Sequence, residues 1–270
     1  MSKLPLLLAH TWDEEQDMTG WWMSEKLDGV RAYWDGHRFL SRLGNEFFAP
    51  SWFTEGFPKV PLDGELFVGR KLFNETVSIV RQHDAGQQWE RVKYLVFDAP
   101  SVGEDKLDFE HRLEAACRLT IKAINAKMVK QQVCKGNDHL RKVMKEMLKV
   151  GAEGVMLRQP GSMYERKRSN TLLKWKDLLT SEGLVVAREP GKGKHKGRLG
   201  ALVVALPGWE KHMDQDHIYD GPTVNVGTGF TDVQREHPPK IGSVVMYSYQ
   251  ELTPAGIPRF PSYLGERKVS

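Results

Sequence analysis

The chain has 270 residues, of which 40% are hydrophobic and 27% are charged, and its net charge at pH 7 is +4. This length is more than a single core comfortably organises, so we expect two domains. The composition is that of an ordinary folded protein, and no apolar stretch approaches the length of a membrane span, so a soluble protein with no membrane partner is expected.

The chain begins with MSKLPLLLAH, which combines a lysine with a short apolar run. The run is too brief for the core of a signal peptide, and no small-residue cleavage pattern follows it. We therefore expect a cytoplasmic protein, or a periplasmic one if a leader has been removed.

The first half of the chain alternates short β-like runs with glycine turns, interspersed with helical patterns. Helices are expected over residues 74–82 and 109–124. A further helix begins at Asn137 or Asp138 and stops at Gly151, because its apolar positions fall on one face. The β-like runs are WWMSEKL (21–27), VRAYWDG (30–36), HRFLSRLGN (37–45), PLDGELFVG (61–69) and VKYLVFDAP (92–100).

Helical periodicity disappears from Leu184 onward, and short strands separated by Gly, Pro and Asp turns replace it. This pattern is typical of a small β-barrel or sandwich. The sequence therefore predicts a mixed α/β (α+β) domain over residues 1–181 and an all-β domain over residues 182–270. The strand-like runs are GLVVARE (183–189), LGALVVAL (199–206), PTVNVG (222–227) and GSVVMYSYQEL (242–252).

Positive charge is concentrated between residues 161 and 200, where ten Lys and Arg face four acids. This local excess is larger than that of the whole chain and indicates a polyanionic partner. The two cysteines, Cys117 and Cys134, are too few for a four-thiolate zinc site.

Lys26 lies in the stretch SEKLDGVR, two residues before Asp28. A lysine is a nucleophile only when its amine is deprotonated, which requires burial or neighbouring cations. Lys174 and Lys176 alternate across Trp175 on an expected strand, so both point to one face. Two lysines on one face repel each other unless an anion such as a phosphate chain lies between them.

Acids beside glycines occur at Asp28, Glu65 and Glu153. Together these carboxylates could bind a hard divalent cation such as Mg²⁺ through oxygen ligands and water. Each acid by itself is typical of an ordinary strand-end turn, so the hypothesis depends on their co-occurrence.

The motifs resemble those of the covalent nucleotidyltransferases, the superfamily of DNA ligases, RNA ligases and mRNA capping enzymes. Within it the chain looks most like the minimal bacterial ATP-dependent DNA ligases of the ligase E type, nearly end to end, including GKGKHKGRLGAL (191–202) and VGTGFT (226–231). The resemblance implies a nucleotidyltransferase domain followed by an oligonucleotide-binding (OB) fold. The motifs, in the order of that superfamily, are KLDGVR (26–31), SRLGN (41–45), DGEL (63–66), YLVFDAP (94–100), EGVML (153–157) and LLKWK (172–176).

The resemblance implies that Lys26 attacks the α-phosphorus of ATP and carries AMP, while Lys174 and Lys176 neutralise the phosphate with the help of Mg²⁺. Phe97 would stack on adenine, Glu65 would meet the ribose and Glu153 would hold the metal. Core packing is the other interpretation of Phe97. The full nucleotide-binding set implied is Glu25, Lys26, Arg31, Glu65, Phe97, Glu153, Lys174 and Lys176, with Asp28, Glu65 and Glu153 as metal ligands.

Nicked duplex DNA is the implied partner, and Asp28, Arg31 and Arg42 would face the nick. Arginine suits this role because its guanidinium presents a fork of donors to phosphate. A solvated surface arginine is the other interpretation of Arg42, and a solvated loop that of residues 192–198. The remaining residues expected to contact DNA are Lys167, Arg168, Lys192, Lys194, Lys196 and Arg198.

ATP is favoured over NAD because only 25 residues precede Lys26 and the cysteines cannot build the zinc finger of the NAD-dependent ligases. The C-terminal motif of ATP ligases is reduced here to Glu266-Arg267-Lys268, and we expect Arg267 and Lys268 to assist the departure of pyrophosphate. A monomer is expected. The alternatives are a capping guanylyltransferase, an RNA ligase or an inactive nucleic-acid-binding module.

Overall fold

The computed structural model describes residues 3–84, 86–100, 106–213, 219–253 and 255–267. The chain divides into two compact units, Met1–Lys176 and Asp177–Ser270. The sequence predicted the domain boundary between residues 181 and 182, within the range Leu179 to Gly183. In the structure Gly183 lies inside a long strand, β12 (Leu179–Pro190), that belongs to the second unit.

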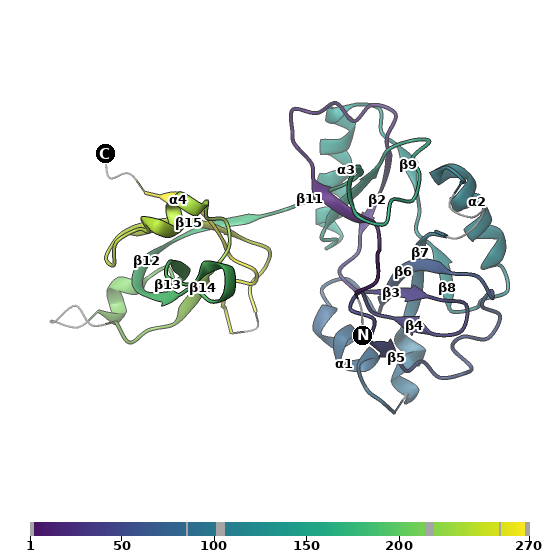
Figure 1. Ribbon diagram of the computed structural model, residues 1–270, viewed down its shortest axis with the longest axis horizontal. Helices are drawn as coiled ribbons and strands as arrows, with labels where there is room; N and C mark the ends of the chain where they lie inside the picture. Colours follow the sequence, from purple (N-terminus) through teal and green to yellow (C-terminus); the bar gives the residue numbers. More distant parts are fainter. Residues whose placement is uncertain (1–2, 85, 101–105, 214–218, 254, 268–270) are drawn as a thin grey trace. The chain divides into compact units, whose positions relative to one another are not determined.

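Two β-sheets form the framework of the first unit (Figure 1). One has the strand order β1-β11-β10-β2-β9, with bounds Leu8–Thr11, Arg168–Lys176, Gly154–Arg158, Trp22–Lys26 and Gln132–Val133. The other has the order β5-β4-β3-β6-β7-β8, with bounds Glu46–Phe47, Phe39–Leu40, Val30–Trp34, Leu62–Phe67, Lys93–Asp98 and Ala126–Met128.

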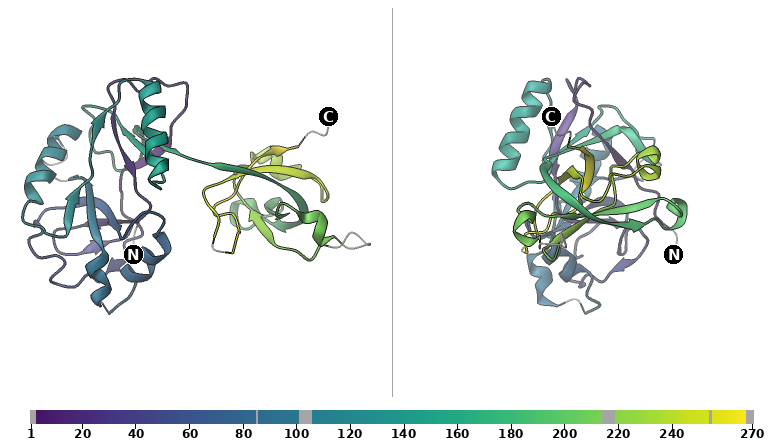
Figure 2. Two further views of the ribbon diagram at one scale, coloured as in Figure 1. Left: turned by 180° about the vertical axis from the view of Figure 1, so that it is seen from behind. Right: turned by 90° about the vertical axis from the view of Figure 1, so that its left-hand side faces the viewer.

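Three helices cover these sheets (Figures 1 and 2): α1 (Phe73–Val80) packs on β6, α2 (Phe109–Leu119) on β7 and α3 (Asn137–Lys149) on β10. A short 3-10 helix, η1 (Gln87–Arg91), precedes β7. The helix expected over 109–124 ends at Leu119, because the Thr120 hydroxyl donates to the Ala116 carbonyl and the chain turns toward β8.

The helix α3 confirms the expected apolar face, since Leu140, Val143 and Met144 are buried against one core of the first unit. Gly151 follows the helix in a left-handed conformation with φ of 81°. Glycine adopts this conformation at little cost, which is why the helix ends there.

The second unit is a five-stranded barrel with the order β14-β13-β12-β15-β16. The first half of β12 pairs with β15 and its second half with β13 (Figure 2). A parallel bridge between Thr228 and Ser262 joins the two ends of the order, which closes the barrel. The remaining strands are β13 (Leu199–Ala205), β14 (Thr223–Val226), β15 (Val244–Tyr249) and β16 (Ser262–Glu266).

Besides the 3-10 turns η2 (Gly193–His195) and η3 (Trp209–His212), the barrel carries a short helix, α4 (Asp232–Glu236), which the sequence did not predict. Its five residues are too few for a periodic pattern, and a capping box of Thr231 and Gln234 starts it. Across the described parts of the chain, no helix has both the length and the apolar character of a membrane span.

Candidate nucleotide-binding and catalytic site

A pocket of about 320 Å³ lies in the first unit, between strands of its two sheets. Segments that are far apart in the sequence meet here, and most of the predicted nucleotide-binding residues line the pocket. From that set, the lining includes Glu25, Lys26, Arg31, Glu65, Phe97, Lys174 and Lys176. Two residues predicted to contact DNA, Arg42 and Arg168, also line the pocket.

Lys26 is the last residue of β2 and lies opposite Gly154 of β10. Its ammonium group contacts one carboxylate oxygen of Glu153, and the ammonium group of Lys176 contacts the other. These three side chains are each less than one-fifth exposed. Glu153 therefore holds the two lysines at the same point of the pocket wall.

Gly154, beside Glu153, has a backbone requirement of its own. Its φ is 154°, and a Cβ here would lie 2.1 Å from the Trp175 carbonyl oxygen. Only glycine lets β10 approach β11 this closely. Gly154, the glycine that follows Glu153 in the sequence, is therefore needed for the close packing of β10 against β11.

Lys174 and Lys176 lie on the same face of β11 and both reach the pocket, as the alternation in LLKWK predicted. Burial lowers the pKa of both amines, and the charge of Lys26 lowers them further. Lys174 and Lys176 also repel each other, an effect that lowers the pKa of Lys174, whereas Glu153 raises both values. A bound anion would relieve this repulsion.

Glu65 on β6 has a pKa raised to about 7. Burial is the largest cause, and the charges of Lys26 and Arg31 oppose it. Gly29 packs directly against this side chain, because a Cβ on Gly29 would lie 2.8 Å from the Cγ of Glu65. Burial therefore favours the protonated form of this carboxyl group more than in an exposed glutamate.

Arg31 on β3 forms a bidentate ion pair with Asp63, with its Nε 3.0 Å from Oδ1 and its Nη2 2.6 Å from Oδ2. The Tyr164 hydroxyl donates to the same Oδ2 at 2.5 Å. Asp63 is completely buried, so both partners are needed to compensate its charge. Arg31 is thereby fixed with its guanidinium at the pocket.

Phe97 lies at a β-bulge, where Asp98 pairs with Asp63 but Val96 already pairs with Gly64. A bulge redirects a side chain, and here Phe97 lines the pocket while its neighbours are buried. Arg31 lies over the ring, 5.5 Å from its centroid. Phe97 is thus a pocket wall, which favours the interpretation as a stacking platform over core packing.

The three predicted metal ligands do not form a ready-made site. Among the residues that the structure describes, no group of three or more His, Cys, Asp or Glu side chains is arranged to hold a metal ion. Asp28 is not part of the pocket lining, and Glu153 is engaged with lysines. The assignment of Asp28, Glu65 and Glu153 as metal ligands, with water completing the shell, therefore stays a prediction. Two carboxylates, Glu65 and Glu153, do influence each other electrostatically.

Other predicted residues have partners that the sequence did not indicate. The Glu25 carboxylate accepts two hydrogen bonds from Arg70, at 2.7 and 2.8 Å. Arg168 donates to the backbone carbonyl of Ala9, and Lys167 pairs with Glu165 at 3.2 Å.

In the second unit, the basic hairpin (residues 192–198) connects β12 to β13 and contains η2. Lys192, Lys194 and Lys196 are all exposed. Arg198 differs, because it forms ion pairs with Asp232 at 3.1 Å and Glu236 at 3.7 Å, both on α4. Four residues of this hairpin were predicted to contact DNA. Three of them are exposed lysines, and the fourth, Arg198, is paired with acids of the same unit.

Of the two C-terminal cations, Arg267 forms an ion pair with Glu182 at 2.7 Å, and Lys268 lies outside the described residues. Both cysteines of the chain, Cys117 and Cys134, are free thiols.

Sequence reasoning missed the buried polar residues behind the pocket. For Asp98 and Arg158 the only signal is a charged residue at the end of an apolar strand, as in FDAP and EGVMLR. The missed residues are Asp63, Asp98, Arg112, Arg158 and Tyr164.

The chain is similar to several known proteins. Residues 8–176 match the family described as ATP dependent DNA ligase domain, and residues 190–267 match the family described as DNA ligase OB-like domain. A DNA ligase of Haemophilus influenzae is 36% identical over 263 residues, which cover 97% of this chain and 92% of that protein. The LigD protein of Pseudomonas aeruginosa is 31% identical over 237 residues but is matched over only 26% of its length.

Among solved structures, one from an analysis of Lig E DNA ligases superimposes with a TM-score of 0.84 at 34% identity, covering 97% of this chain and 98% of that chain. The Chlorella virus DNA ligase-adenylate shares the fold, with a TM-score of 0.55 at 24% identity over 100% of this chain and 99% of that chain. These findings do not favour a capping enzyme, an RNA ligase or an inactive module. The chain therefore belongs to the family of ATP-dependent DNA ligases, with a nucleotidyltransferase domain followed by an OB-fold domain.

Proposed function

We propose that this ligase seals nicks with a 5′-phosphate and a 3′-hydroxyl in duplex DNA, and that it does so through AMP bound covalently to Lys26. The observation that carries the proposal is that two lysine amines, Lys26 and Lys176, contact the carboxylate of Glu153, with Lys174 near enough for its pKa to respond to the charges of all three. Such a cluster lacks negative charge, and the triphosphate of ATP would supply it.

In the first step, the Lys26 amine loses a proton and attacks the α-phosphorus of ATP. A nitrogen–phosphorus bond forms, the bond from the α-phosphorus to the bridging oxygen breaks, and pyrophosphate leaves with that oxygen. The Glu153 carboxylate touches the amine and is the nearest acceptor for its proton. Lys174 and Lys176 would stabilise the negative charge that develops on the phosphate.

Mg²⁺ fits this site as a partner of the substrate. Mg²⁺ is usually held by one or two carboxylates together with substrate phosphates, rather than by a cage of protein ligands. Glu65 and Glu153 supply that number of carboxylates, and Asp28 adds negative charge near Lys176. When bound, the ion neutralises phosphate charge.

Phe97 would stack on adenine, with Glu65 and Glu25 completing the nucleotide contacts. In the second step, an oxygen of the DNA 5′-phosphate attacks the lysyl-AMP phosphorus and releases the Lys26 amine. In the third, the 3′-hydroxyl attacks the 5′-phosphorus and AMP departs. Arg31 and Arg42 line the pocket and would contact the DNA phosphate.

The exposed lysines of the basic hairpin would bind the DNA backbone by neutralising phosphates. Lys167 and Arg168 would extend that contact. We further propose that the enzyme acts as a monomer, and a mass of 30.8 kDa in solution would support this.

The proposal is tested by incubating the protein with Mg²⁺ and α-labelled ATP or GTP and then adding nicked duplex DNA with a 5′-phosphate. Labelling by ATP alone, followed by transfer of the label and sealing, is the expected result. Labelling without sealing would contradict the DNA substrate, and absence of labelling would contradict the covalent step.

A further inference from the structure

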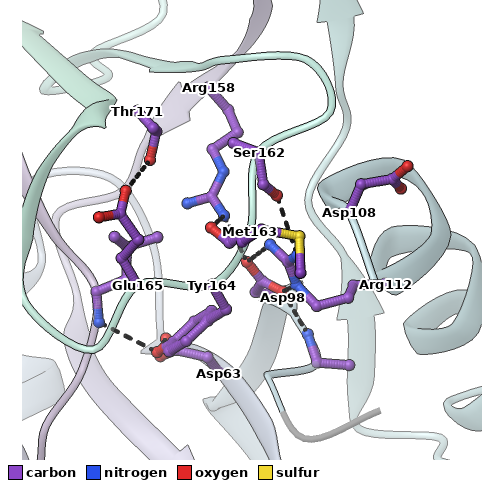
Figure 3. A network of polar contacts seen from close by, with 12 residues as sticks. Asp63, Asp98, Asp108, Arg112, Arg158, Ser162, Met163, Tyr164, Glu165 and Thr171 are labelled. Atoms are coloured by element: carbon purple, nitrogen blue, oxygen red, sulfur yellow. Dashed lines mark hydrogen bonds and ion pairs between the residues drawn. The ribbon is translucent and has the colours of Figure 1, made fainter. Parts of the chain in front are cut away.

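A network of buried charges lies behind the pocket, with Asp98 at its centre (Figure 3). The Arg112 guanidinium donates two hydrogen bonds to this carboxylate, with its Nε 2.7 Å from Oδ1 and its Nη2 3.1 Å from Oδ2. Arg158 approaches the same carboxylate, with its Nη2 3.5 Å from Oδ2. All three side chains are buried, so the protein itself fixes both arginines.

The two arginines also hold the loop that connects β10 to β11. Nη1 of Arg112 lies 3.1 Å from the Ser162 carbonyl oxygen, and Nη2 of Arg158 lies 3.2 Å from the Met163 carbonyl oxygen. Hydrogen bonds from a charged donor are stronger than those between neutral groups. The backbone directly before Tyr164 is therefore anchored, which gives the Tyr164 side chain a defined position.

The Tyr164 hydroxyl connects this loop to Arg31. It donates to Oδ2 of Asp63 at 2.5 Å (Figure 3), and Asp63 in turn forms the bidentate ion pair with Arg31. The backbone N–H of Leu7 donates to the same hydroxyl at 3.3 Å, which leaves the hydroxyl hydrogen for Asp63. Burial and the charge of Asp63 raise the pKa of Tyr164, so the hydroxyl keeps that hydrogen.

The hydroxyl matters because an aspartate side chain does not fix its own orientation. The torsion that turns a carboxylate has a broad distribution of angles, so neighbouring donors decide how the group is oriented. Three donors act on Asp63, namely Nε and Nη2 of Arg31 and the Tyr164 hydroxyl. Without the hydroxyl, the carboxylate and the guanidinium could turn together and keep their own two hydrogen bonds.

We propose that Tyr164 is a positioning residue for the reaction at the nick, because its hydroxyl orients Asp63 and Asp63 orients Arg31 toward the DNA phosphate. This inference rests on the proposed function, in which Arg31 contacts that phosphate. The guanidinium presents its donors as a rigid fork, so a turn of the group misdirects all of them at once. Small displacements of such groups lower reaction rates strongly.

The test compares Tyr164→Phe with the wild type in two separate reactions of the full chain. Labelling of Lys26 by ATP and Mg²⁺ is measured first, by intact-mass spectrometry. The AMP-loaded protein is then freed of ATP and mixed, in excess, with nicked duplex DNA that carries a 5′-phosphate. Transfer of AMP to the DNA and sealing are followed in this single turnover.

Tyr164→Phe removes only the hydroxyl. The Arg112 and Arg166 guanidinium carbons each lie 5.8 Å from the centroid of the ring, and phenylalanine keeps these ring contacts. The rate of transfer and sealing should fall about 10-fold to 100-fold, because a hydrogen bond to a charged group is lost and the guanidinium is misplaced. Labelling by ATP should fall much less, because Glu153 holds Lys26.

Tyr94→Phe is the matched control, because Tyr94 is also a buried tyrosine of the first unit. Its hydroxyl donates to the Ala32 and Leu62 carbonyls, each at 3.0 Å. These two residues adjoin Arg31 and Asp63 in the sequence, so a general loosening of β3 and β6 should appear in this variant as well. Its ratio of transfer rate to labelling rate should stay at the wild-type value.

A double-mutant cycle shows whether Tyr164 acts through Arg31. Arg31→Met should slow transfer to DNA more than Tyr164→Phe does, and adding Tyr164→Phe to Arg31→Met should slow it little further. A purely structural role of the hydroxyl would instead lower the rate by the same factor in both backgrounds. If Arg31→Met does not fold, the ratio of the two rates in Tyr164→Phe and in Tyr94→Phe decides.

Transfer at the wild-type rate in Tyr164→Phe would overturn the inference. An equal loss of labelling and transfer in that variant would overturn it too, as would independent effects of Tyr164→Phe and Arg31→Met. A wild type that ATP does not label, or that does not pass AMP to nicked DNA, would instead contradict the proposed function.

Discussion

The pocket of the first unit and the basic hairpin of the second both carry many positive charges, but they hold them in different ways. In the pocket, Glu153 contacts two lysines and Asp63 forms an ion pair with Arg31. These side chains have little exposure to solvent. In the hairpin, three lysines are exposed, whereas Arg198 is held by two acids of α4.

This difference implies two kinds of function. Shielded charges act strongly and at defined positions, because the effective dielectric is low and each group has a fixed partner. Exposed charges act weakly and additively, and salt screens them. We therefore expect substitutions in the pocket to have large, specific effects and substitutions in the hairpin to have modest, salt-dependent ones.

The largest expected effect is the loss of labelling in Lys26→Ala. This variant removes the only amine proposed to bond to AMP, so labelling by α-labelled ATP should be abolished. Its folding should be retained, as measured by circular dichroism. Lys127→Ala, at an exposed lysine of β8, is the control and should label normally. Residual labelling of Lys26→Ala would refute the assignment.

Asp98→Asn should destabilise the first unit by about 3 to 5 kcal/mol, because it leaves Arg112 and Arg158 buried without their counter-charge. Urea unfolding followed by tryptophan fluorescence measures this, since every tryptophan except Trp209 belongs to the first unit. Asp35→Asn, which breaks an exposed pair with Arg38, should cost less than about 1 kcal/mol. Similar costs for the two variants would show that burial does not distinguish them.

Glu65→Gln should change how the stability of the first unit depends on pH. A carboxyl group whose pKa is raised to about 7 by burial costs stability when it ionises, so the wild type should lose up to about 3 kcal/mol as the pH rises from 4.5 through 7. Glutamine does not titrate, so the stability advantage of the variant should grow over that range. The control is Glu114→Gln at an exposed position, which should show no such trend. A pH-independent difference for Glu65→Gln would contradict the raised pKa.

The smallest effect per residue is expected in the basic hairpin. Replacing Lys192, Lys194 and Lys196 together by Ala should weaken binding to nicked DNA and reduce the slope of log K against log salt by up to about 3. Step-one labelling should be unchanged. Arg198→Ala should reduce the slope by less than one lysine does, because Arg198 is already paired with Asp232. Titrations at several salt concentrations measure these slopes, and an unchanged slope in the triple variant would place the DNA surface elsewhere.

Much of this architecture was predictable from the sequence. The face of α3, the shared face of Lys174 and Lys176 and the β-rich second half follow from periodicity, which is a local property. The motifs also indicated most residues that line the pocket.

The pairing of charges was not predictable, because it depends on contacts across the fold. The Tyr164 hydroxyl donates a hydrogen bond to Asp63 over a sequence separation of 101 residues, and no local sequence pattern predicts that contact. The same holds for the contact between Arg158 and Asp98, and for the contacts of Glu153 with Lys26 and Lys176. The helix α4 was missed because it is too short to be periodic.

The role of Lys26 as the nucleophile is tested most directly by identifying the residue that carries AMP. The wild-type protein is incubated with ATP and Mg²⁺, digested under conditions that preserve the phosphoramidate, and sequenced by tandem mass spectrometry. AMP is expected on Lys26 and on no other residue. AMP on Lys174 or Lys176 would contradict the role of Lys26, because those lysines would then be nucleophiles and not stabilisers of phosphate charge.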